Sequence, residues 1–379
     1  MNTDTTNAFI RFRRELHQFP ERSGKEVETQ SRINAFVRPF NPVRIDEVGG
    51  TGLLLQYGAD VAGPTTVFRA DTDALPIQET NTFAHRSTKA GISHKCGHDG
   101  HTAIMARLAS LLAQQSSLRG RVYLLFQPAE ETGQGAQAVL NDPIFAAIQP
   151  DRIYALHNLP GFPQGAIICK SGSFTPSVQS MIVTFHGRTS HAAEPENGAN
   201  PAYVMADFLL KSKALINPDT QADDFALITP VHTVLGHKDY GTSAGYGEVH
   251  LTLRTWTSLR MEQLVRQLVD SLSTSCNGTA LTTEITFTDV FFANENHQEA
   301  VEEVRQATHK LGYVFTETEQ PFKWGEDFGL FTQQYKGAMF GIGAGEHSPA
   351  LHNDDYDFND ALIEPAARLF LELVKLHHG

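Results

Sequence analysis

The pattern of apolar and polar residues changes twice along this 379-residue sequence, and that change constrains the fold more than any other feature. In the first half, short apolar runs such as TTVFRAD, GRVYLLFQ and RIYALHN are bounded by Gly, Pro or charged residues and predict buried strands. Between them, the segment 101–112 carries apolar residues at helical spacing. Strands that alternate with helices are typical of an α/β layer with a largely parallel central sheet flanked by helices.

Residues 178–287 follow a different order. QSMIVTFHG predicts a half-solvated strand, NPAYVMADFLLKSKALI a helix, FALITPVHTV and YGEVHLTLRTW two strands, LRMEQLVRQLVDSLS a helix and TTEITFTDV a strand. The order β-α-β-β-α-β is that of a ferredoxin-like α+β unit. Because the first pattern resumes after about residue 294, we predict one α/β domain formed by 1–177 and 291–379, interrupted by a smaller domain at 178–290.

The first forty residues predict two helices. The first carries apolar residues at helical spacing and ends before Pro20. The second is expected to follow Ser23, because Glu26 stands three residues later and completes the Ser-x-x-Glu pattern of a capping box.

The charge balance excludes two classes of partner. The chain has 30 basic and 43 acidic side chains, a net charge of −13, and no basic cluster, so nucleic acids and anionic membranes would repel it. No apolar run is long enough for a membrane span, and the first residues do not resemble a signal peptide. The three cysteines lie far apart, which is typical of a reducing compartment. We therefore expect a cytoplasmic protein.

The segment HKCGHDGH at 94–101 is the densest in candidate metal ligands. Cys96 and His98 stand two residues apart in a Gly-containing loop before a predicted helix, and a thiolate and an imidazole both suit a borderline divalent metal. His94 and His101 are expected to orient them. An isolated Cys-x-His is more often a small buried cysteine beside a capping histidine, so the motif needs support from elsewhere.

That support comes from polar groups at the ends of other predicted strands. Asp71 ends TTVFRAD, Glu130 and Glu131 follow GRVYLLFQ, His157 ends another strand, and His352 lies in a loop after GAMFGIG. Ligand sites in open α/β sheets form beyond the carboxyl ends of the strands, so these groups predict one metal centre. In metal-dependent hydrolysis, one of two adjacent carboxylates can bind metal while the other takes a proton from water. Two solvated carboxylates at a helix start are the alternative.

Eight blocks of this sequence resemble the signature blocks of the M20 metallopeptidases. They are RRELHQFPE, RADTDALPIQE, CGHDGHTA, QPAEE, LHN, GRTSHAAEPENGANP, GEDF and a late LHN followed by DYDF, in family order from residue 13 to about 360. The match is best to the aminoacylase branch, the N-acyl-amino-acid amidohydrolases that include hippurate hydrolases and plant auxin-conjugate hydrolases. The resemblance implies a metallopeptidase domain interrupted by a ferredoxin-like lid that mediates homodimerisation, and a small N-acyl-amino acid as substrate.

The resemblance also implies residue roles. Glu130 matches the general acid/base and Asp71 the buried carboxylate that orients the site. His191 matches a histidine that reaches the active site of a neighbouring subunit and stabilises the oxyanion, while Asn158 and Arg254 are expected to contact substrate. Two divalent ions, of zinc, manganese, nickel or cobalt, would be held by five ligands, namely Cys96, His98, Glu131, His157 and His352.

One departure and several alternatives remain. Where many relatives have Gly-x-x-x-Asn-x-Ile-Pro, a stretch that helps to shape the substrate pocket, this chain reads GHKDYGTSAGYG, which puts the usual substrates in doubt. A carboxypeptidase or dipeptidase acting on small peptides is the second candidate function. Cys96 as a covalent nucleophile, Ser243 in a G-x-S-x-G motif, and a structural metal site are more remote.

Overall fold

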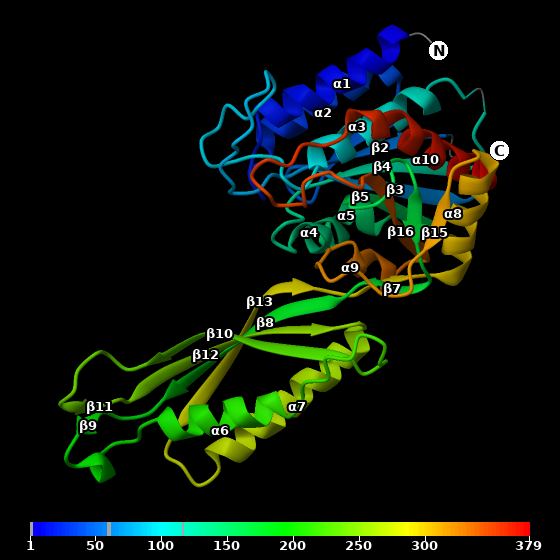
Figure 1. Cartoon of the computed structure of the whole chain (residues 1–379). Coiled ribbons are helices and arrows are strands. Elements are labelled where there is room, and N and C mark those ends of the chain that lie inside the picture. The colour runs from blue at the N-terminus through cyan, green and yellow to red at the C-terminus, as the bar shows by residue number, and fades with distance from the viewer. Residues whose placement is uncertain (1–2, 59–61, 116) are drawn as a thin grey trace. The chain divides into compact units, whose positions relative to one another are not determined.

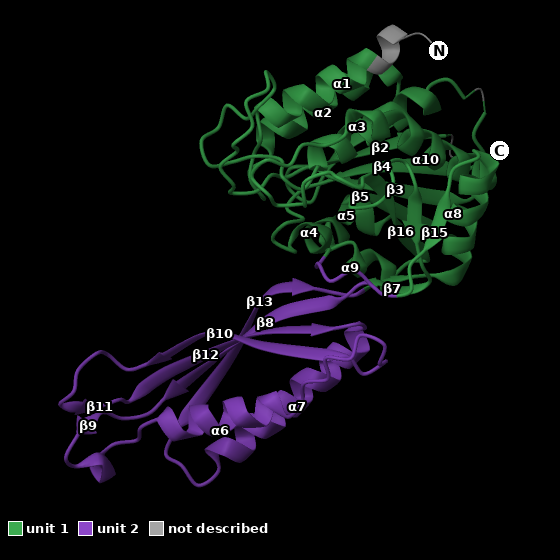
Figure 2. Ribbon diagram, in the orientation of Figure 1, with its two compact units in different colours: residues 1–174, 294–319, 326–379 green, residues 175–293, 320–325 purple. Residues whose placement is uncertain are grey.

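The computed structural model describes residues 3–58, 62–115 and 117–379, and leaves the side chains of residues 3–6 undescribed. The chain divides into two compact units (Figure 2). Unit 1 comprises Met1–Phe174, Asn294–Glu319 and Glu326–Gly379, and unit 2 comprises Thr175–Ala293 and Gln320–Gly325. The sequence placed the first boundary after residue 177 rather than 174, and the second after 290 rather than 293. It also assigned 320–325 to the large domain, whereas this segment clusters with unit 2.

Unit 1 is built on an eight-stranded sheet in the order β1-β2-β4-β3-β5-β16-β6-β15 (Figure 1). The strands are β1 (Arg44–Val48), β2 (Gly52–Tyr57), β3 (Thr65–Asp71), β4 (Arg121–Gln127), β5 (Arg152–Pro160), β6 (Ile167–Cys169), β15 (Phe315–Glu317) and β16 (Gly337–Gly345). The central strands β4, β3, β5 and β16 are parallel, whereas β1 and β2 continue the sheet antiparallel. Each residue of β3 is buried, as expected for a strand covered on both faces. A two-stranded sheet joins β7 (Gly172–Thr175) and β14 (Asn294–Asn296).

Helices cover both faces of this sheet (Figure 1). α3 (His98–Leu112) packs against α1 (Thr3–Gln18), α2 (Val27–Val37) and α10 (Ile363–His378), and α8 (Gln298–Lys310) packs against α10. The short helices α4 (Gly135–Asn141), α5 (Pro143–Ala146) and α9 (Gly329–Thr332) form a separate group. The sequence predicted one apolar face for α3, but the helix is buried all round because α1, α2 and α10 enclose it. Among the described residues, no helix has both the length and the apolar character needed to cross a membrane.

The predicted capping box is wrong. Glu26 precedes α2, but its side chain makes no capping hydrogen bond. Instead it accepts hydrogen bonds from the backbone N–H of Ala129 (2.9 Å) and from the Thr51 hydroxyl (2.6 Å). The Ser23 hydroxyl donates to Asp73 (2.7 Å). Both side chains of the motif thus bind loops that are distant in sequence. Glu26 binds the loop that leads into Glu130 and Glu131, and Ser23 binds the loop that carries Asp73.

Unit 2 is the ferredoxin-like fold that the sequence predicted. Its elements are β8 (Ser177–His186), α6 (Ala202–Lys213), β10 (Ala226–Leu235), β12 (Tyr246–Thr255), α7 (Ser258–Cys276) and β13 (Thr282–Phe291). The four strands form an antiparallel sheet in the order β10-β12-β8-β13. Met181, Val183 and Phe185 alternate along β8 and pack with Phe208 of α6 and Leu264 of α7. A small ribbon of β9 (Ser190–His191) and β11 (Thr242–Ser243) completes the unit.

Candidate metal centre

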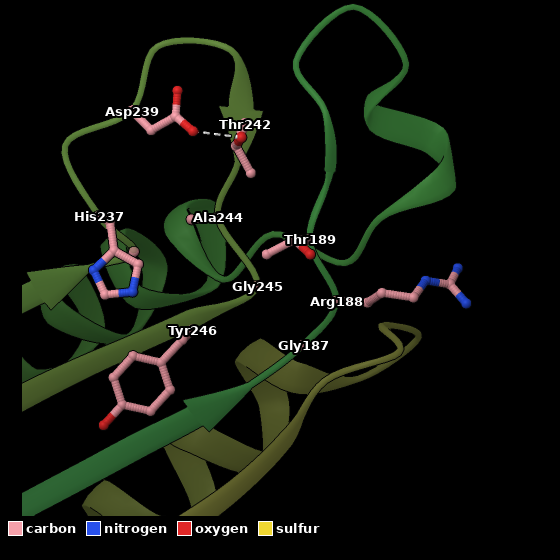
Figure 3. A pocket seen from close by; sticks show the side chains of 10 residues that line it. Gly187, Arg188, Thr189, His237, Asp239, Thr242, Ala244, Gly245 and Tyr246 are labelled. Atoms are coloured by element: carbon pink, nitrogen blue, oxygen red, sulfur yellow. Dashed lines mark hydrogen bonds between the residues drawn. The ribbon is translucent and has the colours of Figure 1, made fainter.

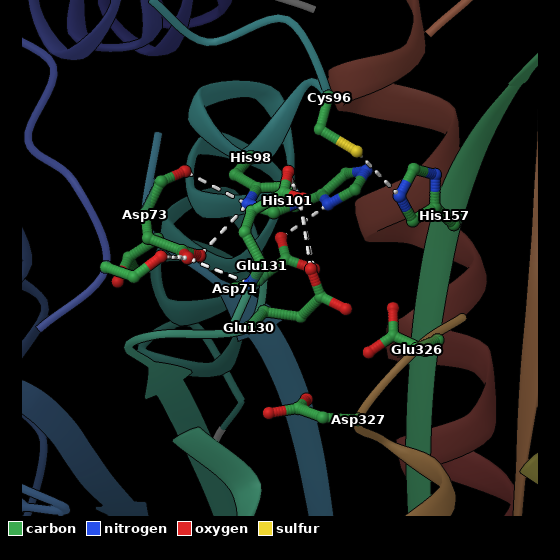
Figure 4. Close-up of polar contacts among 12 residues, drawn as sticks. Asp71, Asp73, Cys96, His98, His101, Glu130, Glu131, His157, Glu326 and Asp327 are labelled. Carbon is green, nitrogen blue, oxygen red and sulfur yellow. Dashed lines mark hydrogen bonds and ion pairs between the residues drawn. The ribbon is translucent and has the colours of Figure 1, made fainter. Parts of the chain in front are cut away.

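The five predicted metal ligands come together in unit 1, although four separate segments supply them, and Figure 4 labels all of them except His352. Cys96 precedes α3, His98 begins it, Glu131 follows β4, His157 lies on β5 and His352 follows β16. The Sγ atom of Cys96 lies 3.5 Å from His157 Nε2 and 3.4 Å from His352 Nε2. His98 Nε2 lies 3.7 Å from Glu131 Oε1. In the groups Cys96–His98–His157 and Cys96–Glu131–His352, all ligand atoms lie within 4.8 Å of one another.

Unusual backbone conformations place these side chains. Gly97, with φ 95°, turns the chain into α3, and a Cβ atom there would overlap the side-chain oxygen of Asn158. Ala129 and His352 have φ values of 53° and 66°, in the left-handed region that non-glycine residues seldom adopt. The backbone N–H of His352 donates to the carbonyl of Lys95 at 2.8 Å, which fixes the two loops together. Such conformations cluster at functional sites because the surrounding structure must hold them.

Two buried atoms in this centre have no hydrogen-bond partner among the described residues. They are His98 Nε2 and Glu131 Oε1, which face one another. His98 Nδ1 lies 3.0 Å from the carbonyl of Asp73, so this nitrogen donates, and Nε2 is the nitrogen that can offer a lone pair to a metal once it loses its proton. His157 Nδ1 likewise lies 2.9 Å from the carbonyl of Asn158. Because ligating histidines almost always donate their other N–H in this way, the residues present fit a divalent metal.

Asp73, to which the sequence analysis gave no role, orients two of the predicted ligands. One carboxylate oxygen lies 3.2 Å from His98 Nδ1. The other accepts hydrogen bonds from the Ser23 hydroxyl (2.7 Å) and from the backbone N–H of Glu131 (3.0 Å). Of the two aspartates, only Asp71 was predicted from the sequence to orient the site. The Asp-x-Asp spacing was a usable signal, because residues two apart at a strand end lie on the same side.

Asp71 is held by a different set of donors. One of its oxygens lies 2.6 Å from His101 Nδ1, and the other accepts from the Arg69 guanidinium at 2.8 Å. His101 Nε2 lies 2.6 Å from the Asn158 side-chain oxygen. Asp71, His98 and His101 are close enough to form a metal-binding group, but both ring nitrogens of His101 are already engaged. His101 is therefore placed to orient Asp71, in agreement with the expectation that it supports the ligands.

The pKa shifts of the side chains in the centre favour the binding of cations. Burial raises the pKa of Glu131 to about 7, and burial together with Glu326 raises the pKa of Glu130 well above its usual range. Burial would lower the pKa of His98, but the neighbouring Asp71 and other carboxylates raise it to about 10. Burial also raises the pKa of the Cys96 thiol. Each of these shifts favours the protonated form of the group, and bound dications would favour the ionised or neutral ligating forms instead.

The remaining predicted site residues are not part of this ligand cluster. His191 and Arg254 belong to unit 2, where His191 is exposed on β9 and Arg254 donates to the carbonyl of Lys323 at 2.7 Å. Asn158 is fully buried in unit 1, and its amide donates to the Tyr356 hydroxyl at 2.7 Å. Both ends of the Asn158 side chain are thus engaged, since its oxygen lies beside His101.

Two alternative nucleophiles have the wrong surroundings. Ser243 lies on β11 and is followed by strand β12, whereas a nucleophile elbow requires a strand, a sharp turn and a helix. Cys96 is buried with a raised thiol pKa, whereas reactive cysteines are accessible and have lowered pKa values.

Unit 2 also contains a cavity of 430 Å³ beside the ribbon that carries His191 (Figure 3). Its lining includes Thr189, His237, Thr242 and Tyr246. The loop 236–245 that lines one side is the stretch in which the sequence departs from the family pattern.

Comparison with known proteins agrees with this geometry. The family model for "Peptidase family M20/M25/M40" matches residues 67–376. The chain is 30% identical to N-acetyl-L-cysteine deacetylase of Bacillus subtilis, over 97% of this chain and 87% of the relative, and 27% identical to hippurate hydrolase of Campylobacter jejuni, over 98% and 96%. The crystal structure of the Bacillus subtilis YXEP protein, described as a dinuclear metal-binding peptidase of family M20, aligns with a TM-score of 0.84, 25% identity and 99% coverage of both chains. The chain therefore belongs to the peptidase family M20/M25/M40, as a metal-dependent amidohydrolase.

Proposed function

We propose that this enzyme uses two divalent metal ions to hydrolyse the amide bond of N-acyl-amino acids, releasing a carboxylic acid and an amino acid. The observation that carries the proposal is that the five predicted ligands lie close together. Within this cluster, two buried ligand atoms, His98 Nε2 and Glu131 Oε1, have no hydrogen-bond partner among the described residues. The names of the relatives, a deacetylase of an N-acetyl amino acid and a hippurate hydrolase, support the substrate class.

Within this proposal Glu130 is the general acid/base. Metal ions held at the centre would polarise the substrate carbonyl and acidify a water molecule. Glu130 is buried, and its Oε2 lies 3.9 Å from His98 Nε2, beside the predicted ligand Glu131. It takes a proton from the attacking water and returns it to the leaving amine, for which a carboxyl with a raised pKa is suited. His191, by its resemblance, donates a hydrogen bond to the oxyanion in the site of a neighbouring subunit.

The test is Glu130→Gln, assayed with N-acetyl- and N-benzoyl-amino acids after loading with zinc, manganese, nickel or cobalt. We expect kcat to fall by about 10² to 10⁴ fold, because a general base contributes about that much, while the metal content stays at two per chain. Glu303→Gln is the matched control, since this half-buried glutamate pairs with Arg152 and does not belong to the centre. Hydrolysis by the Glu130→Gln variant at the wild-type rate would refute the proposed base.

The same screen separates the second candidate function. Preference for dipeptides with a free carboxylate over all acyl-amino acids would identify a dipeptidase or carboxypeptidase. Loss of activity with a chelator and its recovery with metal, combined with resistance to thiol alkylation, would distinguish the metal mechanism from a Cys96 nucleophile. We expect substrate selectivity to differ from that of relatives with Asn-x-Ile-Pro, because the loop 236–245 has another sequence here.

We also propose that the chain forms a homodimer through unit 2. α6 exposes Tyr203 (88%) and Leu210 (69%), and the edge strand β10 exposes Val231 (58%). Exposed apolar side chains on a helix and a free strand edge suit pairing with a second copy. Tyr203→Glu combined with Leu210→Glu should convert the dimer to a monomer in sedimentation experiments. Leu259→Glu on α7, where the side chain is 63% exposed, should not.

A further inference from the structure

Arg69 is a fully buried arginine next to the candidate metal centre. It lies on β3, two residues before Asp71, and its side chain has no exposed surface. Its Nε donates to Gln127 (2.8 Å) and one Nη donates to Asp71 (2.8 Å). The other Nη donates to both Glu326 and Asp327, each at 2.9 Å. One guanidinium thus joins the ends of β3 and β4 to a segment more than 250 residues away along the chain.

The contact with Asp71 decides what this carboxylate can do. Asp71 Oδ2 lies 3.7 Å from His98 Nε2, the unpartnered nitrogen of the centre, and Asp71 belongs to one of the groups that could hold a metal. That same oxygen accepts from Arg69, and the other oxygen lies 2.6 Å from His101 Nδ1. These two bonds fix the orientation of the carboxylate, and turning it toward a metal would break a charge-assisted hydrogen bond in a buried site, which is costly.

We propose that Arg69 is a positioning residue that, together with His101, keeps Asp71 from ligating the metal ions. This inference rests on the proposed function. Asp71 then contributes negative charge close to the ions while the ligand set stays at the five predicted residues. A coordination position remains open for water or substrate, which a catalytic metal site requires.

An arginine is needed for this role because its planar fork reaches several acceptors at once. Lysine keeps the positive charge but is a single point donor on a flexible stem, and it cannot hold Asp71, Gln127 and the 326–327 segment together. Arg69→Lys is therefore the informative variant. It removes the simultaneous hydrogen bonds of the guanidinium and keeps a positive charge among the three buried carboxylates.

The experiment uses the cobalt-loaded enzyme, because the visible absorption of Co²⁺ weakens as its coordination number rises. In Arg69→Lys, we expect Asp71 to become an additional ligand, so the cobalt absorption weakens while cobalt affinity, measured by competition with a chelator, is kept or tightened. We expect kcat to fall by about 10 to 100 fold, as is typical when a partner of the ligands is lost. Asp71→Asn added to Arg69→Lys should restore the absorption of wild type, because the amide does not replace the carboxylate.

Two further variants keep the test decisive. His101→Ala frees the other oxygen of Asp71 without touching the contacts of Arg69, and it should weaken the absorption even if Arg69→Lys does not fold. Arg107→Lys is the control, because Arg107 is a buried arginine on α3 that pairs with Glu364 at 2.8 Å instead. An unchanged cobalt spectrum in folded Arg69→Lys and His101→Ala would overturn the inference. Failure of wild type to bind cobalt would instead overturn the proposed function.

Discussion

Metal binding to the stripped enzyme should release protons, and the structure indicates how many. In the metal-free protein His98, with a pKa of about 10, carries a proton at pH 8, and so does the Cys96 thiol, whose pKa burial raises. His157 and His352 have pKa values lowered by burial, so they are neutral and have no proton to give. We therefore expect at least about two protons to be released at pH 8, with a further contribution from Glu131 as the pH falls below about 7.

The magnitude follows from linkage. Each proton released makes the apparent binding constant rise about tenfold per pH unit, so the overall constant for loading both zinc ions should rise by at least about a hundredfold between about pH 7.5 and 8.5. Titration calorimetry in two buffers of different ionisation enthalpy counts the protons directly. A count of zero at pH 8 would refute the assignment of His98 and Cys96 as protonated groups that become ligands.

Two variants separate the contributions. Cys96→Ser should release about one proton fewer on metal binding, because the serine hydroxyl keeps its proton in the metal complex whereas the cysteine thiol loses its own. His352→Ala should weaken binding but leave the proton count unchanged, since the imidazole is already neutral. A change in the count for His352→Ala would show that the direction of its pKa shift is wrong.

Two other predictions concern stability. Burial would lower the pKa of His17, but Asp99 (2.8 Å) and Glu79 raise it from 6.5 to about 9, so its stabilising effect is complete below pH 6.5 and is lost as the pH rises through about 9. In urea unfolding, His17→Gln should therefore destabilise more at pH 6 than at pH 9.5, and an equal loss at both would contradict this. Phe370→Ala should cost about 3 to 5 kcal/mol of unfolding free energy, because its ring is buried against Phe68 and Phe340, with centroids at 5.1 and 5.5 Å. Val314→Ala, at a side chain 66% exposed, should cost less than about 0.5 kcal/mol, and similar losses for the two would contradict the assigned core.

The elements of both units were predictable because their signals are local. A buried parallel strand and an alternating half-solvated strand each show a pattern within about ten residues, and the order of elements identified the ferredoxin-like unit. The extent of burial was less predictable. α3 was expected to bury one face, and it buries all of its surface because helices from both ends of the chain enclose it.

The candidate site shows where local reasoning fails. Ser23 and Glu26 form a capping box by sequence, yet they hold Asp73 and the backbone at Ala129. Asp71 and Asp73 stand two residues apart in RADTDALP at one strand end, and only the path of the loops shows that Asp73 faces His98. Arg69 could not be assigned at all, because its partners at 326 and 327 approach it only in the folded chain. Local rules are expected to break where function imposes other demands.

These failures share a physical cause. The buried centre holds several carboxylates, and each of them needs hydrogen-bond donors or a cation to offset its negative charge. Two carboxylates outside the predicted ligand set are held by donors of the protein, Asp71 by Arg69 and His101, and Asp73 by Ser23, His98 and a backbone N–H. The unpartnered His98 nitrogen and Glu131 oxygen face one another at the centre instead. Because an unsatisfied buried polar group is costly, this arrangement favours a bound cation that these atoms could ligate. The side chains that break the local rules of sequence thus hold Asp71, Asp73 and the backbone before Glu130 in place, and His98 Nε2 and Glu131 Oε1 stay available to the metal ions that we propose.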